Sequence, residues 1–151
     1  MPLNFYAATL LLFAMFVNAQ TIVAQNTSVP SLKEIFRNDF LIGTAINTRE
    51  IEEKDTAADR LIKQQFNAVT PENIMKAEII QPGWDIYNFD LADKLVAFAK
   101  RNSIKVNAHN LIWHSQLPSF MHHMQDADSV RKYFVNHINT VAGRYDGKVY
   151  S

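Results

Sequence analysis

A regular alternation of short apolar runs with amphipathic segments is the feature of this chain that most constrains its fold. Apolar runs over residues 40–46, 66–70 and 104–113 predict buried strands, and residues 149–150 resemble the first residues of a fourth. Helical spacing of apolar residues predicts helices between them. Strands joined by crossover helices run parallel, so the sequence predicts an α/β fold with a parallel sheet covered by helices.

The expected helices carry capping signals and apolar faces. The first spans residues 31–36 and opens with a capping-box spacing, and the second follows Asp55. A brief helical turn is expected over 72–79 and an amphipathic helix over 91–101. The helix that follows Asp55 has an apolar face of Ala58, Leu61, Ile62 and Phe66. The last helix covers 130–145, with Asp126 or Asp128 as its cap and Asp146-Gly147 at its end.

Composition excludes several functional classes. The 15 Lys and Arg residues balance 15 Asp and Glu residues, so no basic excess directs the chain to nucleic acid. The chain has no cysteine, which excludes disulfides, thiolate metal sites and a cysteine nucleophile. It also lacks H-E-x-x-H, His-x-His and G-x-S-x-G patterns, so we expect no metal centre, no serine hydrolase and no cofactor.

The N-terminal part differs from the rest, since no charged side chain appears before Lys33. The apolar run over residues 5–17 is too short to span a bilayer, which takes roughly 20 residues, but has the length of a secretory signal core. We predict a signal peptide over residues 1–24, cleaved after Ala19 or Ala24, and a leader over 25–31. The protein would then be secreted or periplasmic, without stable membrane insertion; the alternative is a buried N-terminal helix.

Two architectures fit the strand and helix order: an open doubly wound sheet and a (β/α) barrel. A dinucleotide-binding sheet carries G-x-G-x-x-G after its first strand, whereas this chain has a single glycine there, at Gly43. Polar side chains instead gather where the predicted strands end, which is where a (β/α)₈ barrel has its active site. The residues in question are Asn47, Glu72, Asn73, Lys76, His109, Trp113 and His114.

The segment TPENIMK over residues 70–76 carries the first polar group. On a helical turn, Glu72 and Lys76 would form an ion pair with Asn73 beside them. An acceptor, an amide and an ammonium placed together can bind neighbouring sugar hydroxyls. On this motif alone, a capped turn with a surface salt bridge is the better explanation.

The segment NAHNLIWHSQLP over residues 107–118 carries the second. On a strand, His109 and Trp113 would point to one face and His114 to the other. An indole offers a flat apolar platform for a sugar ring, and an imidazole can hydrogen-bond a hydroxyl. A core tryptophan and a satisfied core histidine are the structural alternative.

Together these segments resemble glycoside hydrolase family 10 xylanases. TPENIMK is similar to the T-P-E-N-x-M-K segment of that family, and NAHNLIWHSQLPSFM to its G-H-x-L-x-W-H-x-Q-x-P-x-W/F segment. The likeness covers residues 32–151, with departures at Ile74, Ala77 and Asn107-Ala108. The resemblance implies the N-terminal half of a (β/α)₈ barrel that hydrolyses internal β-1,4 links of xylan with retention.

The resemblance also implies roles for individual residues. Glu72, Asn73, Lys76, His109 and Trp113 would bind xylan and xylo-oligosaccharides, and Asn47 and His114 would support them. Both catalytic glutamates of the family would lie beyond Ser151, so the 151-residue chain is expected to be inactive alone. The complete protein is expected to be a monomer. The alternatives are a non-catalytic xylan- or glycan-binding protein and an unrelated α/β protein.

Overall fold

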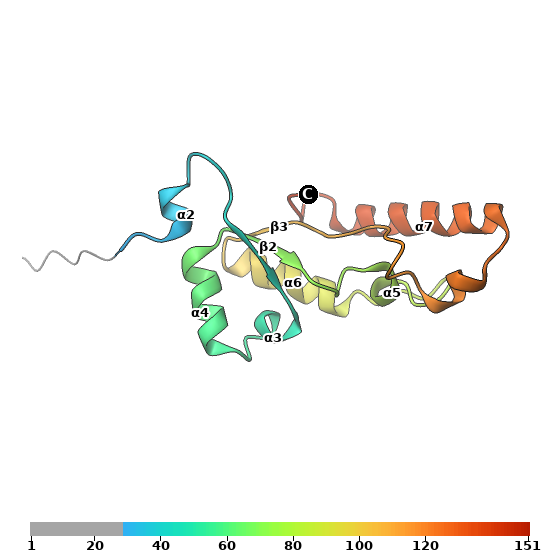
Figure 1. The fold of residues 1–151 in the computed structure, drawn as a ribbon, viewed down its shortest axis with the longest axis horizontal. Coiled ribbons are helices and arrows are strands. Elements are labelled where there is room, and N and C mark those ends of the chain that lie inside the picture. The colour runs from blue at the N-terminus through green and yellow to red at the C-terminus, as the bar shows by residue number, and fades with distance from the viewer. Residues whose placement is uncertain (1–28) are drawn as a thin grey trace, which may run out of the picture.

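The computed structural model describes residues 29–151. The predicted signal peptide and most of the predicted leader lie outside the described residues. Figure 1 shows an elongated arrangement with α7 extending away from the strands. The elements in chain order are α2 (Leu32–Ile35), β1 (Gly43–Ile46), α3 (Thr48–Ile51), α4 (Thr56–Gln65), β2 (Ala68–Pro71), α5 (Ala77–Ile80), α6 (Asp90–Arg101), β3 (Lys105–Val106), η1 (Ser119–His123) and α7 (Ala127–Tyr145).

The sheet is parallel, and its strands lie in chain order β1-β2-β3. Gly43 pairs with Ala68, which pairs with Lys105 on the other side. Consecutive parallel strands lying side by side are the arrangement of a (β/α) barrel. The predicted parallel α/β fold is therefore confirmed.

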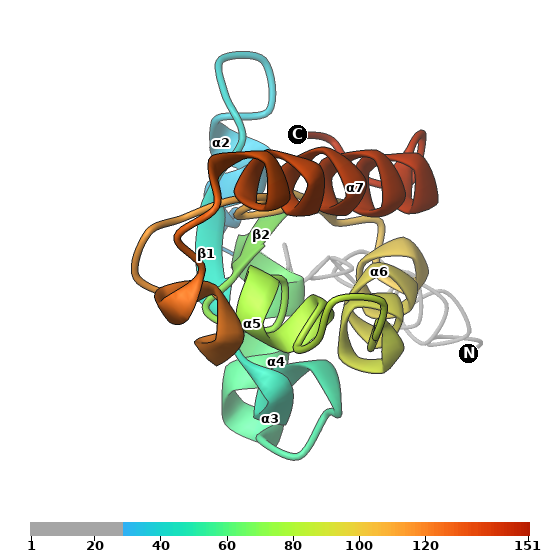
Figure 2. The same cartoon turned by 90° about the vertical axis from the view of Figure 1, so that its right-hand side faces the viewer.

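The core fills the space between this sheet and the helices. Val69 and Val106 are buried at 0% and 2% exposure on the helix side of the sheet, and Leu95 and Phe98 of α6 are completely buried. Val141 and Tyr145 add the end of α7 to the same cluster. Figure 2 shows α7 at the top of the view, α6 at the right and α3 at the bottom, with the strands between them.

A polar contact joins α6 to α7. Asp93 of α6 accepts hydrogen bonds from Arg144 of α7, with 3.1 Å to the Nε atom, and from the Tyr145 hydroxyl at 2.9 Å. The Arg144 guanidinium also lies 4.3 Å from the centre of the Phe89 ring. Hydrogen bonding from Arg144 lowers the pKa of Asp93. We call these residues the α6–α7 clasp.

The helix caps mostly follow the sequence signals. The Glu34 carboxylate accepts the Ser31 N–H at 2.7 Å, and the Asp55 side chain accepts the Ala58 N–H at 3.1 Å. Of the two candidates for α7, Asp126 is the cap, because its carboxylate accepts the Ser129 N–H at 2.9 Å.

The face of α4 was predicted incorrectly at one position. Leu61 is 54% exposed, whereas Asp59 is only 5% exposed. The buried stripe runs through Asp59 and Ile62, three residues apart, so Leu61 points to solvent. Burial raises the pKa of Asp59, whose Oδ1 atom has no hydrogen-bond partner within residues 29–151.

The predicted strand over residues 104–113 was wrong in its length. Only Lys105 and Val106 pair with β2. In this register Pro71, the last residue of β2, falls opposite Ala108, so the chain beyond Ala108 has no neighbouring strand on that side and continues as a loop to η1. The two-face alternation predicted for this segment therefore does not apply.

The C-terminal residues lie beside β3, as expected of a fourth strand, although no full strand forms there. Tyr150 donates its N–H to the Val106 carbonyl at 2.8 Å, and Ala108 donates to the Ser151 carbonyl at 2.6 Å. Figure 1 shows the C-terminus returning to this position after α7. Gly147, with φ of +66°, supplies the left-handed residue that turns the chain after the helix.

Candidate functional site

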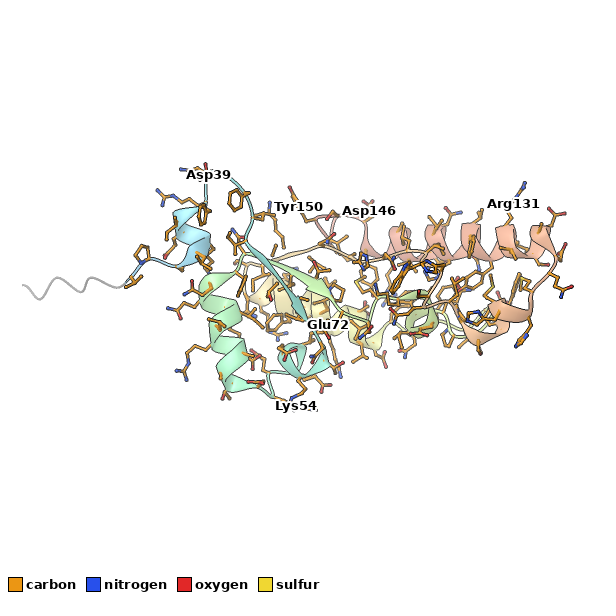
Figure 3. The ribbon with its side chains drawn as sticks, in the orientation of Figure 1. Asp39, Lys54, Glu72, Arg131, Asp146 and Tyr150 are labelled. Carbon is orange, nitrogen blue, oxygen red and sulfur yellow. The ribbon has the colours of Figure 1, made fainter. Side chains whose placement is uncertain are left out.

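The candidate site lies where β2 and β3 end. Two loop segments meet there, residues 72–76 after β2 and residues 107–118 after β3. Glu72 opens the first segment, and its N–H donates to the Ile46 carbonyl of β1 at 2.9 Å. Figure 3 shows Glu72 at this end of the strands, away from Asp39 and Tyr150.

Lys76 is the centre of the site. Its residue is 3% exposed, its Nζ atom lies 2.6 Å from His109 Nδ1, and the same atom lies 4.8 Å from the centre of the Trp113 ring. An ammonium can only donate, so Nδ1 of His109 must accept and the ring proton of a neutral His109 must sit on Nε2. Burial lowers the pKa of Lys76.

Trp113 supplies a partly open aromatic surface. Its residue is 39% exposed, and its ring packs edge-on against His114 with 5.6 Å between ring centres. The contact restrains the indole while part of it stays in solvent. The structure thus brings Lys76, His109 and Trp113 together through side chains of two loops.

The predicted ion pair between Glu72 and Lys76 was wrong. The helical turn expected over residues 72–79 is limited to α5, which begins after Lys76. Glu72 and Lys76 are therefore not stacked on a helix, and within residues 29–151 the Glu72 carboxylate forms no ion pair or hydrogen bond. It remains exposed at the edge of the site.

Asn73 is held by Gln116, which is not among the predicted site residues. Gln116 donates from Nε2 to Asn73 Oδ1 at 3.0 Å and to Glu78 Oε1 at 2.9 Å. Gln116 is the fixed glutamine of the quoted family segment, and that motif position is the signal that could have identified it. Its partners are 43 and 38 residues away, so only the tertiary structure reveals the contact.

Asn47 acts at the neighbouring strand end. Its side chain accepts the Arg49 N–H at 2.9 Å, and its own N–H donates to the Glu50 carboxylate at 2.9 Å. Asn47 therefore caps α3 and shapes the end of β1. His114 contacts Trp113 directly, through the edge-on ring packing described above.

The arrangement is suited to binding neutral hydroxyl groups. Lys76, His109 and Asn73 can donate hydrogen bonds, Glu72 can accept them, and the Trp113 ring can receive an apolar sugar face. Within residues 29–151, no three His, Asp or Glu side chains are grouped closely enough to hold a metal ion.

Comparison with known proteins identifies relatives of this chain. The chain is 39% identical over 128 residues to a β-1,4-xylanase of Dictyoglomus thermophilum, covering 85% of this chain and 35% of the relative. It is 39% identical over 132 residues to endo-1,4-β-xylanase A of Xylanibacter ruminicola, covering 84% and 35%. The chain thus spans about a third of the length of these relatives.

Solved structures agree in fold. Xylanase 10B of Thermotoga petrophila, solved in complex with xylobiose, has a TM-score of 0.75 at 33% identity, over 81% of this chain and 38% of that one. A family 10 xylanase of Thermobacillus composti has a TM-score of 0.71 at 38% identity, over 80% and 37%. The described residues form part of a (β/α)₈ barrel, and the unrelated α/β protein considered above is excluded.

The strongest assignment comes from the family comparison, because it spans both loops of the site. Residues 31–151 match glycosyl hydrolase family 10. The chain belongs to glycosyl hydrolase family 10.

Proposed function

We propose that this chain is part of an endo-1,4-β-xylanase, which hydrolyses internal β-1,4-xylosidic bonds of xylan with retention of configuration. The observation that carries the proposal is the position of Lys76, whose ammonium contacts both the His109 imidazole and the Trp113 indole at the strand ends. Named xylanases of the same family are the relatives of this chain, and one was solved with xylobiose.

The proposed role of the site is to bind xylose units next to the scissile bond. Xylose is neutral and rich in hydroxyl groups, so an ammonium and an imidazole N–H would act on it as hydrogen-bond donors. Asn73 and Glu72 would bind further hydroxyls, and Trp113 would stack on a sugar ring. Asn47 and His114 would hold the strand end and the indole in place.

Retaining hydrolysis requires two carboxyl groups about 5–5.5 Å apart, one acting as acid/base and one as nucleophile. We assign neither role to the carboxylates at this site. Glu72 has the position of a binding residue in the resemblance, and Glu78 is bonded to Gln116. The placement of both catalytic glutamates beyond Ser151 stays a prediction.

A binding experiment tests the proposal. Xylotriose is titrated against the full chain while tryptophan fluorescence is recorded. The chain has two tryptophans, and Trp84 is packed against Phe120 and Tyr133. We expect Trp84→Phe to keep a saturable response and Trp113→Phe to lose it. A response that disappears with Trp84 and survives without Trp113 would contradict the site.

A hydrolysis assay tests the division between binding and catalysis. The 151-residue chain is incubated with xylan, and reducing ends are measured against a blank. We expect binding without hydrolysis, and clear hydrolysis would refute the assignment of the acid/base group. Binding without hydrolysis also fits a non-catalytic glycan-binding protein. A W-D-x-x-N-E segment following Ser151 in the coding sequence would favour the enzyme, and its absence the binding protein.

We also propose that the protein is exported, on the basis of the apolar run over residues 5–17. Among residues 29–151, no helix has the length and apolar character needed to cross a bilayer. N-terminal sequencing of protein recovered outside the cytoplasm should give a chain that starts at Gln20 or Gln25. Recovery of an uncleaved chain only from the cytoplasm would refute export.

A further inference from the structure

Glu78 is joined to the candidate site through a single amide group. The Gln116 Nε2 atom donates one hydrogen bond to Glu78 Oε1 at 2.9 Å and one to Asn73 Oδ1 at 3.0 Å. A backbone bond from Glu78 N–H to the Gln116 carbonyl, 3.1 Å long, holds the two residues in register. We call Glu78, Gln116 and Asn73 the amide relay.

The direction of the relay follows from the chemistry of its first member. A carboxylate only accepts hydrogen bonds, whereas the two ends of a side-chain amide differ, since the oxygen accepts and the nitrogen donates. Only the nitrogen of Gln116 can therefore face Glu78. The same nitrogen faces Asn73, so the Asn73 oxygen must point to Gln116 and the Asn73 NH₂ group must point away from it.

This outcome matters because Asn73 is the exposed end of the relay. Glu78 and Gln116 are partly buried, while Asn73 is exposed beside Glu72. With its oxygen occupied by Gln116, Asn73 presents two N–H donors at the site. A reversed Asn73 would present an acceptor next to the Glu72 carboxylate, which is already an acceptor.

We propose that Glu78 is a positioning residue that sets the direction of the amide relay and makes Asn73 a hydrogen-bond donor to a sugar hydroxyl. The inference rests on the proposed function for the identity of the ligand. Glu78 itself does not touch the sugar. It acts by removing the alternative orientation of two amides that would otherwise reverse at little cost.

The first test needs no ligand. In an NMR spectrum of the ¹⁵N-labelled full chain, the side-chain amides are assigned by comparison with Gln116→Ala and Asn73→Ala. We expect both Gln116 amide protons to exchange slowly with solvent, because both are hydrogen-bonded, and the Asn73 amide protons to exchange rapidly. In Glu78→Gln, which keeps the size of the side chain, Gln116 protection should fall. Fast Gln116 exchange in the wild type would overturn the inference.

The second test measures the consequence for binding. Glu78→Gln allows both directions of the relay, so the competent orientation loses population and xylotriose should bind roughly two- to fivefold more weakly. In an Asn73→Ala background the same substitution should have no further effect. Asp39→Asn, at an exposed position away from the site, is the matched control and should bind as the wild type does.

The outcomes separate this inference from the proposed function. If Glu78→Gln weakens binding equally with and without Asn73, the residue acts through the fold and the inference is wrong. If Glu78→Gln binds as tightly as the wild type, the inference is also wrong, although xylotriose binding stands. If neither the wild type nor any variant binds xylotriose but the amide exchange pattern is as expected, the proposed function is wrong, whereas the role of Glu78 in the amide relay stands.

Discussion

Among the cations that lie over aromatic rings in residues 29–151, Arg144 and Lys76 have opposite surroundings. Arg144 of the α6–α7 clasp lies 4.3 Å from the Phe89 ring centre, is exposed, and is paired with the Asp93 carboxylate. Lys76 of the site lies 4.8 Å from the Trp113 ring centre and is 3% exposed. Within residues 29–151, Lys76 forms no ion pair with a carboxylate; its bonded partner is the neutral ring of His109.

The difference distinguishes a structural contact from the contact that we propose to be functional. The charge of Arg144 is compensated, and its pKa is raised, mainly by hydrogen bonding to Asp93. Burying a charge without an opposite partner is unfavourable, and the pKa of Lys76 is lowered accordingly. A buried cation that has no opposite charge beside it and lies next to a partly exposed indole is better explained by ligand binding than by stabilisation of the fold.

The same substitution at both cations gives the sharpest test, and the larger effect is expected at Lys76. Lys76→Met should weaken xylotriose binding by roughly 10- to 100-fold, the factor that corresponds to losing a charge-assisted hydrogen bond. Its thermal unfolding midpoint should not fall, because methionine removes a buried charge. Fluorescence titration and calorimetry measure the two quantities. Unchanged affinity would remove the functional meaning of the comparison.

Arg144→Met should have the complementary effect. We expect its thermal unfolding midpoint to fall by a few degrees, because Asp93 and Tyr145 lose their partner across α6 and α7. Xylotriose affinity should stay at the wild-type value. If instead affinity falls and the midpoint does not, the assignment of the two regions is reversed.

A smaller effect is expected in acid. The pKa of Asp93 lies below its ordinary value of 3.8, so folding favours the carboxylate. The resulting stability is complete above pH 3.8 and is lost as the pH falls through the lower pKa of the folded state. The unfolding midpoint of the wild type should therefore drop more steeply in this range than that of Asp93→Asn. The Asp93 side chain is 44% exposed, so the difference should be modest and should shrink with added salt.

The smallest effect is expected in alkali, where the stability rises instead of falling as the pH moves away from neutrality. The pKa of Lys76 lies below its ordinary value of 10.5, so folding favours the neutral amine. Between the lowered pKa and 10.5, the unfolded chain binds more protons, and stability should rise with pH relative to Lys76→Met. Chemical denaturation of both proteins across this range measures the difference. A decline relative to the variant would show that folding favours the ammonium.

Much of the fold was predictable because its signals are local. The helices α4 and α7 follow from capping residues and apolar spacing, and α6 follows from apolar spacing. The parallel order β1-β2-β3 follows from the alternation of strands and helices. The errors lie where the structure of a segment depends on whether a neighbouring strand is there to pair with it. The run over 104–113 has strand-like composition, but β2 stops at Pro71, so most of it cannot pair.

The site was predictable as a set of residues and not as a set of contacts. Lys76, His109 and Trp113 were selected from two motifs and do meet. The expected partner of Lys76 was Glu72, whereas the observed partner is His109, 33 residues away. Gln116 was overlooked although it occupies the fixed glutamine position of the family segment, because its partners Asn73 and Glu78 lie far away along the chain.

The sequence by itself determined the family, the parallel α/β fold and the segments that carry the site, because capping, apolar spacing and motif order act over short stretches of chain. Only the tertiary structure decided which donor meets which acceptor. Hydrogen bonds between Lys76 and His109, and between Gln116 and Asn73, depend on how two loops approach after β2 and β3 have paired. Such contacts join residues far apart along the chain, and short sequence patterns do not specify the distance between such residues in space.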